Sequence, residues 1–191
     1  SDIVIAGCAL LLTLPLLLVC AAIIRLQDGG PVFFSQVRVG RSNRQFRILK
    51  FRSMYVESAD ADGNRSASRR DDRITPFGRI IRATSIDELP QLINVLKGDM
   101  SIVGPRPHAL GSTAENLLFW DIDETYWHRH AMKPGLTGLA QVRGYRGATM
   151  SKEYLLNRLQ SDLEYMRTWT IWRDIAIMIR TFNVLLHRNA F

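Results

Sequence analysis

The chain opens with one long apolar segment. No charged residue occurs from Ile3 to Ile24, a run of 22 positions that is long enough to cross the hydrocarbon core of a bilayer as a helix. Pro15 lies near its middle, where proline removes a backbone hydrogen bond and predicts a kink. Two arrangements stay open, a kinked span or a helix that enters and leaves on one face, with Thr13 helping to satisfy the freed carbonyl groups. The arginine-rich sequence that follows predicts a cytoplasmic C-terminal flank.

After a break at residues 28–31 (DGGP), the pattern becomes alternating. Residues 32–39 and 46–54 each alternate apolar with polar side chains, and residues 40–45 (GRSNRQ) are typical of a turn. A β-hairpin is therefore predicted. Residues 57–75 lack apolar periodicity and predict a mobile loop.

The remaining pattern is mostly helical. Residues 76–83 predict a short helix or turn, and residues 133–147 contain four glycines, which predicts turns with closely approaching backbone. Residues 152–186 have helical periodicity. The face of this last segment could meet the core or lie among lipid headgroups; it carries Trp169, Trp172, Ile175, Ile179, Phe182 and Leu186.

Composition narrows this picture. With 191 residues, 47% of them hydrophobic, the chain has the size of one domain with a real core. Its net charge of +7 comes mainly from arginine, whose planar fork suits phosphorylated small molecules, anionic lipid or nucleic acid. The two cysteines, Cys8 and Cys20, both lie in the apolar segment and suit neither a disulfide framework nor a metal site, so we expect a reducing, cytosolic setting for the folded part.

An acidic pair stands out in this basic chain. Asp87 and Glu88 lie in the stretch TSIDELPQLINVLKGDMSIVGPRP. Ser85 and Glu88 have the spacing of a helix capping box, but such a helix would contain Pro90; a start at Asp87 or Glu88 would put Pro90 in the first turn, with Gly98 closing the helix. Either start places Asp87 at the positive end of a helix, where it should be ionised at neutral pH. The pair alone favours this capping role.

The residues around the pair also suit chemistry. Adjacent carboxylates can share a hard cation such as Mg²⁺, and a carboxylate can act as ligand, nucleophile or base in phosphoryl transfer. Arg106 is held between two prolines, which stiffen its backbone. Lys50 and Arg52 alternate on the second hairpin strand and are expected on one face, and Arg82 precedes the pair by five residues. Together these cations would surround the carboxylates with phosphate-binding groups.

Three extended motifs carry a family resemblance. They are KFRSM at 50–54, DELPQLINVLKGDMSIVGPRP at 87–107 and KPGLTGLAQVRG at 133–144, and they follow a proline-broken apolar segment. In this order they resemble the bacterial sugar transferase family, the monotopic phosphoglycosyl transferases. The resemblance covers essentially the whole chain. It implies transfer of a sugar 1-phosphate from a nucleoside diphosphate sugar to a polyprenyl phosphate, usually undecaprenyl phosphate.

The resemblance also implies roles for single residues. Asp87 would be the nucleophile and a Mg²⁺ ligand, forming a covalent phospho-sugar intermediate and releasing UMP. Glu88 would complete the dyad as base or metal partner. The basic residues Lys50, Arg82 and Arg106 would bind phosphate, and the two half-reactions would follow a ping-pong order.

The implied fold is α+β and mainly helical. Residues 1–27 would form a re-entrant membrane helix broken at Pro15, residues 28–150 a catalytic core with the hairpin, and residues 151–191 amphipathic interfacial helices. The active site would lie on the cytoplasmic face of the bacterial inner membrane, in contact with its lipids. Leu14 departs from the serine expected before the proline in some relatives and cannot supply a hydroxyl group.

Two segments, QVRGYRG at 141–147 and HRNAF at 187–191, resemble larger members, the undecaprenyl-phosphate glucose phosphotransferases. The chain is therefore expected to be the C-terminal part of a longer protein that uses UDP-glucose or UDP-galactose in exopolysaccharide, capsule or O-antigen synthesis. No nucleic-acid partner is expected, and a homo-oligomer stays open. The competing hypotheses are a membrane-tethered nucleic-acid-binding protein, a non-catalytic membrane adaptor, and a phosphohydrolase that uses Asp87 but transfers to water.

Overall fold

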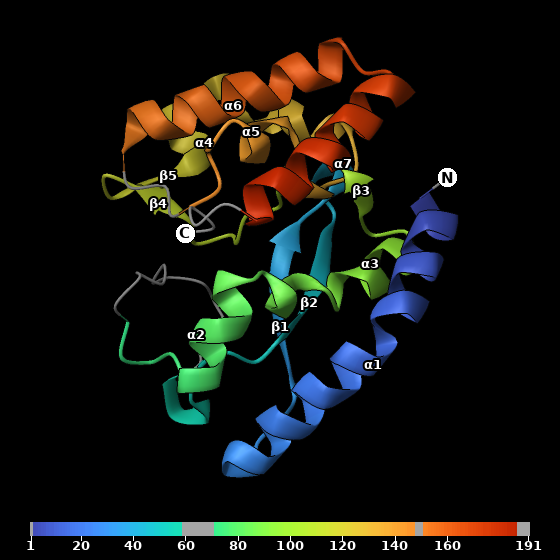
Figure 1. The fold of residues 1–191 in the computed structure, drawn as a ribbon. Coiled ribbons are helices and arrows are strands. Elements are labelled where there is room, and N and C mark those ends of the chain that lie inside the picture. Colours follow the sequence, from blue (N-terminus) through green and yellow to red (C-terminus); the bar gives the residue numbers. More distant parts are fainter. Residues whose placement is uncertain (1, 59–70, 148–150, 187–191) are drawn as a thin grey trace.

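The computed structural model describes residues 2–58, 71–147 and 151–186, which form a mixed α/β fold (Figure 1). The α+β, mainly helical class is confirmed, with an apolar N-terminal helix and small sheets. The α-helices are α1 (Asp2–Asp28), α2 (Pro76–Ala83), α3 (Gln91–Lys97), α4 (Phe119–Ile122), α5 (Leu139–Val142), α6 (Lys152–Arg167) and α7 (Ile171–Leu186). The 3₁₀ helices are η1 (Arg41–Asn43), η2 (Val56–Ser58), η3 (Ile86–Glu88) and η4 (Glu124–Ala131). The strands are β1 (Phe33–Val39), β2 (Gln45–Phe51), β3 (Ser101–Val103), β4 (Thr113–Ala114), β5 (Leu117–Leu118) and β6 (Gly135–Thr137).

Helix α1 contains Pro15 at its centre and stays helical across it. The axis of α1 changes direction about half-way along its length (Figure 1), in agreement with the predicted kink. Proline frees the carbonyl group four residues before it, which belongs to Leu11. The Thr13 hydroxyl donates instead to the Ala9 carbonyl oxygen, at 2.8 Å. The prediction that Thr13 satisfies the freed carbonyl is therefore wrong, because the geometry of a helix directs its hydroxyl to its own preceding turn.

Most of the apolar surface of α1 faces outward. The helix is long and apolar enough to cross a membrane, with a mean hydropathy of 2.8 over its most apolar window. A narrow stripe of Ala6, Cys20 and Ile24 packs on the rest of the chain. Leu10 and Leu17 are half-buried beside this stripe, and most of the other large apolar side chains are exposed, among them Ile3, Val4, Leu11, Leu12, Leu18, Val19 and Leu26.

Polar contacts tie both ends of α1 to the rest of the fold. At the first turn, the Ser101 hydroxyl donates to the Asp2 carboxylate at 2.6 Å. At the last turn, the Arg52 guanidinium binds both carboxylate oxygens of Asp28 at 2.5 Å and donates to the Pro31 carbonyl oxygen at 2.6 Å. The Arg52 side chain is thus committed to the end of α1. The prediction that it shares the face of Lys50 beside the acidic pair is wrong, because Arg52 lies just beyond the end of β2.

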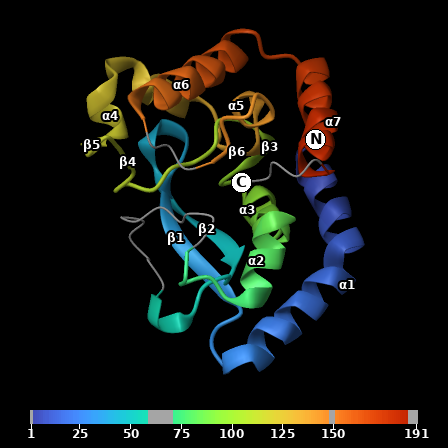
Figure 2. The same cartoon turned by 60° about the vertical axis from the view of Figure 1, so that its left-hand side comes forward.

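The predicted hairpin is confirmed. Strands β1 and β2 pair antiparallel, with Phe33 opposite Phe51 and Phe34 opposite Lys50. The turn at η1 places Ser42 and Asn43 in the left-handed region, at φ 56° and 60°. In both views α3 lies between this hairpin and α1 (Figures 1 and 2), so the segment joining α2 to α3 is held against β2. Most of the predicted loop at 57–75 lies outside the described residues.

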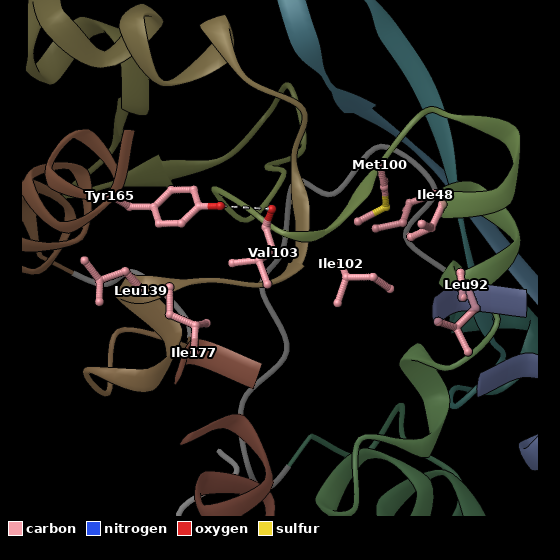
Figure 3. Packing of buried hydrophobic residues seen from close by; sticks show 10 residues of the cluster. Ile48, Leu92, Met100, Ile102, Val103, Leu139, Tyr165 and Ile177 are labelled. Carbon is pink, nitrogen blue, oxygen red and sulfur yellow. Dashed lines mark hydrogen bonds between the residues drawn. The ribbon is translucent and has the colours of Figure 1, made fainter. Parts of the chain in front are cut away.

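The main core joins the two halves of the chain. Buried side chains from β2, α3, β3, α5, α6 and α7 meet in one cluster, together with Ala6 of α1 (Figure 3). Its labelled members include Met100, Ile102 and Val103 around β3, with Tyr165 and Ile177 from the two C-terminal helices. This core holds β3 rigidly at the centre of the molecule, and the chain that leaves β3 leads directly to Arg106.

The glycine-rich segment brings backbone into close contact, as predicted. Strand β6 pairs parallel with β3, with Ser101 opposite Gly135. A Cβ atom at Gly135 would lie 2.1 Å from the Gly104 nitrogen, and one at Gly138 would lie 2.2 Å from the Gly104 oxygen. Real Cβ atoms do not approach backbone this closely, so only glycine fits here. This packing positions Pro105 and Arg106, which follow immediately.

The C-terminal segment forms two helices. The segment predicted to be helical, 152–186, consists of α6 and α7, which are separated at residues 168–170, and α7 turns away from α6 (Figure 1). Helix α7 packs through Ile177, which is 2% exposed. The apolar stripe predicted for the segment lies largely on the outside; the exposed members are Trp169, Trp172, Ile175, Ile179 and Phe182. The Leu186 side chain lies outside the described part.

Candidate active site

The acidic pair lies in the 3₁₀ turn η3, directly before α3. The capping-box interpretation is wrong, because Ser85 adopts φ 58° and its side chain caps no backbone group. The alternative start at Asp87 or Glu88 is wrong as well, because α3 begins at Gln91 with Pro90 as its N-cap residue. Gly98 ends the helix in the left-handed conformation, as predicted. Because η3 is a separate tight turn, both carboxylates are buried in the fold and do not lie at the start of an α-helix.

Glu88 is the centre of a buried ion cluster. The Lys50 ammonium group lies 2.8 Å from its Oε1 atom, and the Arg106 guanidinium binds both carboxylate oxygens, at 2.5 and 3.1 Å. Arg146 adds a third cation at 3.7 Å. Burial acts to raise the pKa of Glu88, but Arg106 and Lys50 outweigh it and hold the pKa well below its usual range. Glu88 is therefore ionised and saturated with cations.

Asp87 is in a different state, although it is the next residue. It is 7% exposed, and within the described part of the chain no hydrogen bond or ion pair reaches its carboxylate. Burial raises the pKa of Asp87 to about 6, with Lys50 opposing and Glu88 reinforcing the shift. A carboxyl with this pKa is mostly ionised at pH 7, but burial opposes its charge, and the positive helix end that was predicted to favour the charge is absent because Asp87 lies in η3. Such a group is a candidate nucleophile.

The structure brings the three predicted phosphate-binding residues to the pair. Lys50 and Arg106 contact Glu88 directly, as described. Arg82 lies in the last turn of α2, where its Nη1 atom is 3.4 Å from the Ser53 hydroxyl oxygen, and its charge acts to lower the pKa of Asp87. Burial lowers the pKa of the Lys50 ammonium, and Glu88 opposes that shift.

Two contributors to the site were missed in the sequence. Arg146 comes from the glycine-rich segment and donates to the Ser85 hydroxyl as well as approaching Glu88. Asn94 of α3 is buried and bridges to β2, accepting from the Leu49 amide at 2.9 Å and donating to the Arg47 carbonyl oxygen at 2.8 Å. In the sequence, Arg146 could have been noticed because it lies between two glycines in the glycine-rich segment 133–147. Asn94 had no such signal, because its partners lie 45 and 47 residues away in the chain.

The carboxylate oxygens of the site limit how the predicted Mg²⁺ ion could be held. Within the described residues, no three His, Cys, Asp or Glu side chains come close enough to hold a metal by themselves. Mg²⁺ in phosphoryl-transfer sites typically takes one or two carboxylates and completes its shell with water and substrate phosphate. The Glu88 oxygens already bind cations, whereas Asp87 offers unpaired oxygens. The site therefore fits a Mg²⁺ ion that Asp87 would hold together with a substrate phosphate.

Comparison with known proteins agrees with the motifs. The family model described as bacterial sugar transferase matches residues 1–188. An undecaprenyl-phosphate glucose phosphotransferase of Komagataeibacter xylinus is 50% identical over 188 residues, covering 97% of this chain and 35% of that protein. A UDP-glucose:undecaprenyl-phosphate glucose-1-phosphate transferase of Caulobacter vibrioides is 48% identical over 97% of this chain and 68% of its own length. The exopolysaccharide production protein PSS of Rhizobium leguminosarum bv. phaseoli is 44% identical over 94% of this chain and 90% of its own length.

The match therefore extends from the apolar helix through the acidic pair to the C-terminal helices, and the chain spans only about a third of the first of these relatives. The chain belongs to the bacterial sugar transferase family.

Proposed function

We propose that this chain transfers a sugar 1-phosphate from a UDP-sugar to undecaprenyl phosphate and releases UMP. The observation that carries the proposal is the contrast within the acidic pair: Glu88 is saturated with cations, while the buried Asp87 carboxylate is unpaired in the described structure. Two of the relatives named above, from Komagataeibacter xylinus and Caulobacter vibrioides, are named as transferases of this kind. Their names supply the substrate class, and the geometry supplies the reacting group.

In the first half-reaction, a carboxylate oxygen of Asp87 attacks the phosphorus that bears the sugar. A bond forms between this oxygen and the phosphorus, and the bond from that phosphorus to the oxygen bridging the two phosphates breaks. UMP leaves with the bridging oxygen and its electron pair. The sugar phosphate stays on Asp87 as an acyl phosphate, so the carboxylate must act as a nucleophile rather than as a base.

In the second half-reaction, a phosphate oxygen of undecaprenyl phosphate attacks the same phosphorus. The bond to Asp87 breaks, the carboxylate is restored, and the sugar leaves on a polyprenyl diphosphate. Because UMP departs before the lipid reacts, the kinetic order is ping-pong. Both half-reactions take place at the same phosphorus and use the Asp87 carboxylate, first as nucleophile and then as leaving group. One carboxylate is therefore enough for the whole reaction.

The basic residues have a shared role in this proposal. Lys50, Arg82 and Arg106 would bind the diphosphate and stabilise the negative charge on the transferring group. Glu88 would hold Lys50 and Arg106 in place, since an ionised carboxylate between two cations keeps both from repelling each other. A bound Mg²⁺ ion, held by Asp87 and substrate phosphate, would neutralise phosphate charge as a Lewis acid.

We also propose that the chain sits on the cytoplasmic face of the inner membrane. The exposed apolar side chains of α1 would enter the lipid, and the bend at Pro15 would let the helix return to the same face as a re-entrant segment. On α7, Trp172 and Phe182 are 77% and 68% exposed, which suits the headgroup layer. The reaction centre would then lie near the surface where the lipid phosphate is found.

Glucose is the first sugar to test. Relatives named for glucose transfer include those of Klebsiella pneumoniae and Escherichia coli, at 42% and 46% identity. Others are named for different sugars: an Aeromonas hydrophila protein for N-acetylgalactosamine, at 40%, and a Streptococcus agalactiae protein as a galactosyl transferase, at 41%. A panel of these UDP-sugars therefore decides the donor, and exopolysaccharide synthesis is the proposed pathway.

The test uses the protein in detergent or nanodiscs with Mg²⁺, each UDP-sugar and undecaprenyl phosphate. UMP release together with labelled lipid is expected for at least one donor. Without the lipid, one equivalent of UMP per enzyme is expected, because the intermediate has no acceptor. Continuous release of sugar 1-phosphate into water would identify a hydrolase, and the absence of UMP with every donor would refute the transferase proposal.

The pH dependence of the first half-reaction is a separate prediction. The pKa of Asp87 lies at about 6, so the nucleophilic form dominates above that pH and is lost below it. The rate of single-turnover UMP release should therefore fall about tenfold for each pH unit below 6. The measurement is a quench experiment between pH 4.5 and 8, with folding monitored at each pH. A rate that stays flat down to pH 5 would contradict the raised pKa.

A further inference from the structure

A second buried ion pair lies behind Arg106. Arg129 of η4 is 2% exposed and is bound to Asp162 of α6, which is also 2% exposed. The Asp162 Oδ2 atom accepts from Nε at 3.0 Å and from Nη2 at 2.6 Å. Burying two charges costs desolvation energy, and an apolar pair of similar size is often no less stable. A pair buried this deeply therefore suggests a role other than stability.

The remaining hydrogen bonds of Arg129 go to Arg106 and His108, on either side of Pro107, and to Tyr126. Nη2 donates to the Arg106 carbonyl oxygen at 2.8 Å, and Nη1 donates to His108 Nδ1 at 2.8 Å and to the Tyr126 hydroxyl oxygen at 3.2 Å. All five N–H groups of the guanidinium are thus used. Arg129 holds the chain on both sides of Pro107, once through backbone and once through a side chain.

The neutral state of His108 fits this arrangement. Burial lowers the pKa of His108 well below its usual value, and Arg158 and Arg129 lower it further. A neutral imidazole can accept at Nδ1, which the donor from Arg129 requires; this tautomer follows from the hydrogen-bond network. Burial and the neighbouring arginines therefore favour the neutral form of His108, which can accept from Arg129.

A continuous line of contacts then connects α6 to the acidic pair. It runs from Asp162 to Arg129, from Arg129 to the Arg106 backbone, and from the Arg106 guanidinium to Glu88. The prolines on each side of Arg106 leave this backbone little freedom to adjust. Because the Arg106 carbonyl group is held by Arg129, the direction in which the Arg106 guanidinium points is restricted as well.

We propose that Arg129, anchored by Asp162, is a positioning residue for the reaction centre, which fixes the backbone of Arg106 so that its guanidinium stays on Glu88 and beside Asp87. The inference rests on the proposed function for its kinetic consequence, but the geometry can be tested without substrate. Lysine cannot replace Arg129 in this role, because a single ammonium group cannot reach Asp162 and the Arg106 carbonyl in the same fixed geometry. Arg129 itself touches neither carboxylate of the pair in the described structure.

The substrate-free test follows the Arg106 guanidinium by ¹⁵N NMR in the wild-type chain and in Arg129→Lys. In the wild-type chain the Arg106 Nη groups donate to the buried Glu88 carboxylate, so their hydrogens should exchange slowly with water. In Arg129→Lys we expect this exchange to become faster, because the guanidinium is no longer held on Glu88. Assignment uses Arg106→Lys, in which the guanidinium signal disappears.

Arg52→Lys is the matched control. Arg52 is also a buried, bidentate partner of a carboxylate, but it binds Asp28 at the end of α1. Both lysine variants should lower the melting temperature. The exchange of the Arg106 guanidinium hydrogens should become faster only in Arg129→Lys. If the two variants lose stability alike and neither changes this exchange, Arg129 is structural and the positioning role is refuted.

A double-mutant cycle supplies the kinetic arm. Arg129→Lys should lower kcat/KM on the order of 10- to 100-fold, because small displacements of a positioned charge are costly. In an Arg106→Ala background the same change should have almost no further effect, since the guanidinium that it positions is gone. Independent, multiplying effects would overturn the proposal. Faster exchange of the Arg106 guanidinium in Arg129→Lys, together with a wild-type chain that releases no UMP, would support positioning and refute the transferase function separately.

Discussion

Replacing Asp87 with asparagine is expected to abolish UMP release, with a loss on the order of 10⁴-fold or more in the first half-reaction. An amide keeps the size of the side chain but has no anionic oxygen to attack phosphorus. The buried Asp87 carboxylate has no hydrogen-bond or ion-pair partner among the described residues, and this makes it the proposed nucleophile. The measurement is a single-turnover assay with radiolabelled UDP-sugar, together with mass spectrometry of the protein. Wild-type protein should gain the mass of one sugar phosphate, and Asp87→Asn should gain none.

The same substitution should leave the fold at least as stable. The pKa of Asp87 is raised to about 6, so its folded environment favours the neutral form, and between the ordinary carboxyl pKa and 6 stability falls as the pH rises. A neutral asparagine avoids this penalty at pH 7. We therefore expect an unchanged or higher melting temperature, which separates loss of chemistry from loss of folding.

Glu88→Gln is the neighbouring control, and its stability effect should have the opposite sign. The folded-state pKa of Glu88 is lowered by Arg106 and Lys50 against the effect of burial, so its ionisation stabilises the fold above the unfolded pKa, and that contribution is lost as the pH falls through the folded pKa. Removing its charge leaves Lys50, Arg106 and Arg146 facing one another. The melting temperature at pH 7 should fall.

Full turnover in Asp87→Asn, or mass labelling that persists there, would rule out Asp87 as the nucleophile.

Gly135→Ala is expected to destabilise the protein by at least about 3 kcal/mol, since overpacking against rigid backbone cannot relax cheaply. Its Cβ would meet the Gly104 nitrogen at 2.1 Å and the Thr137 oxygen at 2.4 Å. Relief would require separating β6 from β3 and displacing the chain that leads to Arg106. The expected result is a large drop in melting temperature or failure to recover folded protein.

Gly147→Ala provides the matched control in the same glycine-rich segment. A Cβ atom at Gly147 would have no atom of the described residues within 4 Å, and its φ is not in the left-handed region. Its stability should stay within about 0.5 kcal/mol of the wild type, as for surface substitutions in general. Equal stability of both alanine variants would show that β3 and β6 are not packed as closely as the structure has them.

The adjacent carboxylates show how one sequence motif acquires two functions. Glu88 lies against Lys50 of β2 and Arg106 beyond β3, whereas Asp87 faces the same cations without contacting them. One carboxylate organises positive charge, and the other stays available. Two groups with opposed pKa shifts are a recognised arrangement for dividing roles in catalysis.

Several elements could be predicted from local pattern alone. The alternation at 32–39 and 46–54 yielded the β1–β2 hairpin, because one face of each strand meets the core. The apolar run yielded α1, and Gly98 marked the end of α3. These features depend on neighbouring residues, so the sequence is enough to see them.

Several predictions were wrong for residues whose partners lie far away in the chain. The capping box at Ser85 matched a local motif, but Glu88 binds Lys50 and Arg106 instead of its own helix. Arg52 was expected at the site, but it binds Asp28 at the end of α1. The C-terminal periodicity runs through residues 168–170, where the chain in fact breaks so that both helices can reach the core.

The sequence by itself determined the apolar helix, the hairpin, the glycines of the close β3–β6 contact, and the set of acidic and basic residues from which a phosphoryl-transfer site is built. These follow from periodicity, backbone sterics and residue chemistry, which are local properties. Only the tertiary structure decided that Asp87 is unpaired while Glu88 is saturated, and that Arg146 and Arg129 belong to the surroundings of the site. Charge states depend on burial and on which charges come within a few ångströms, and packing of distant segments sets both.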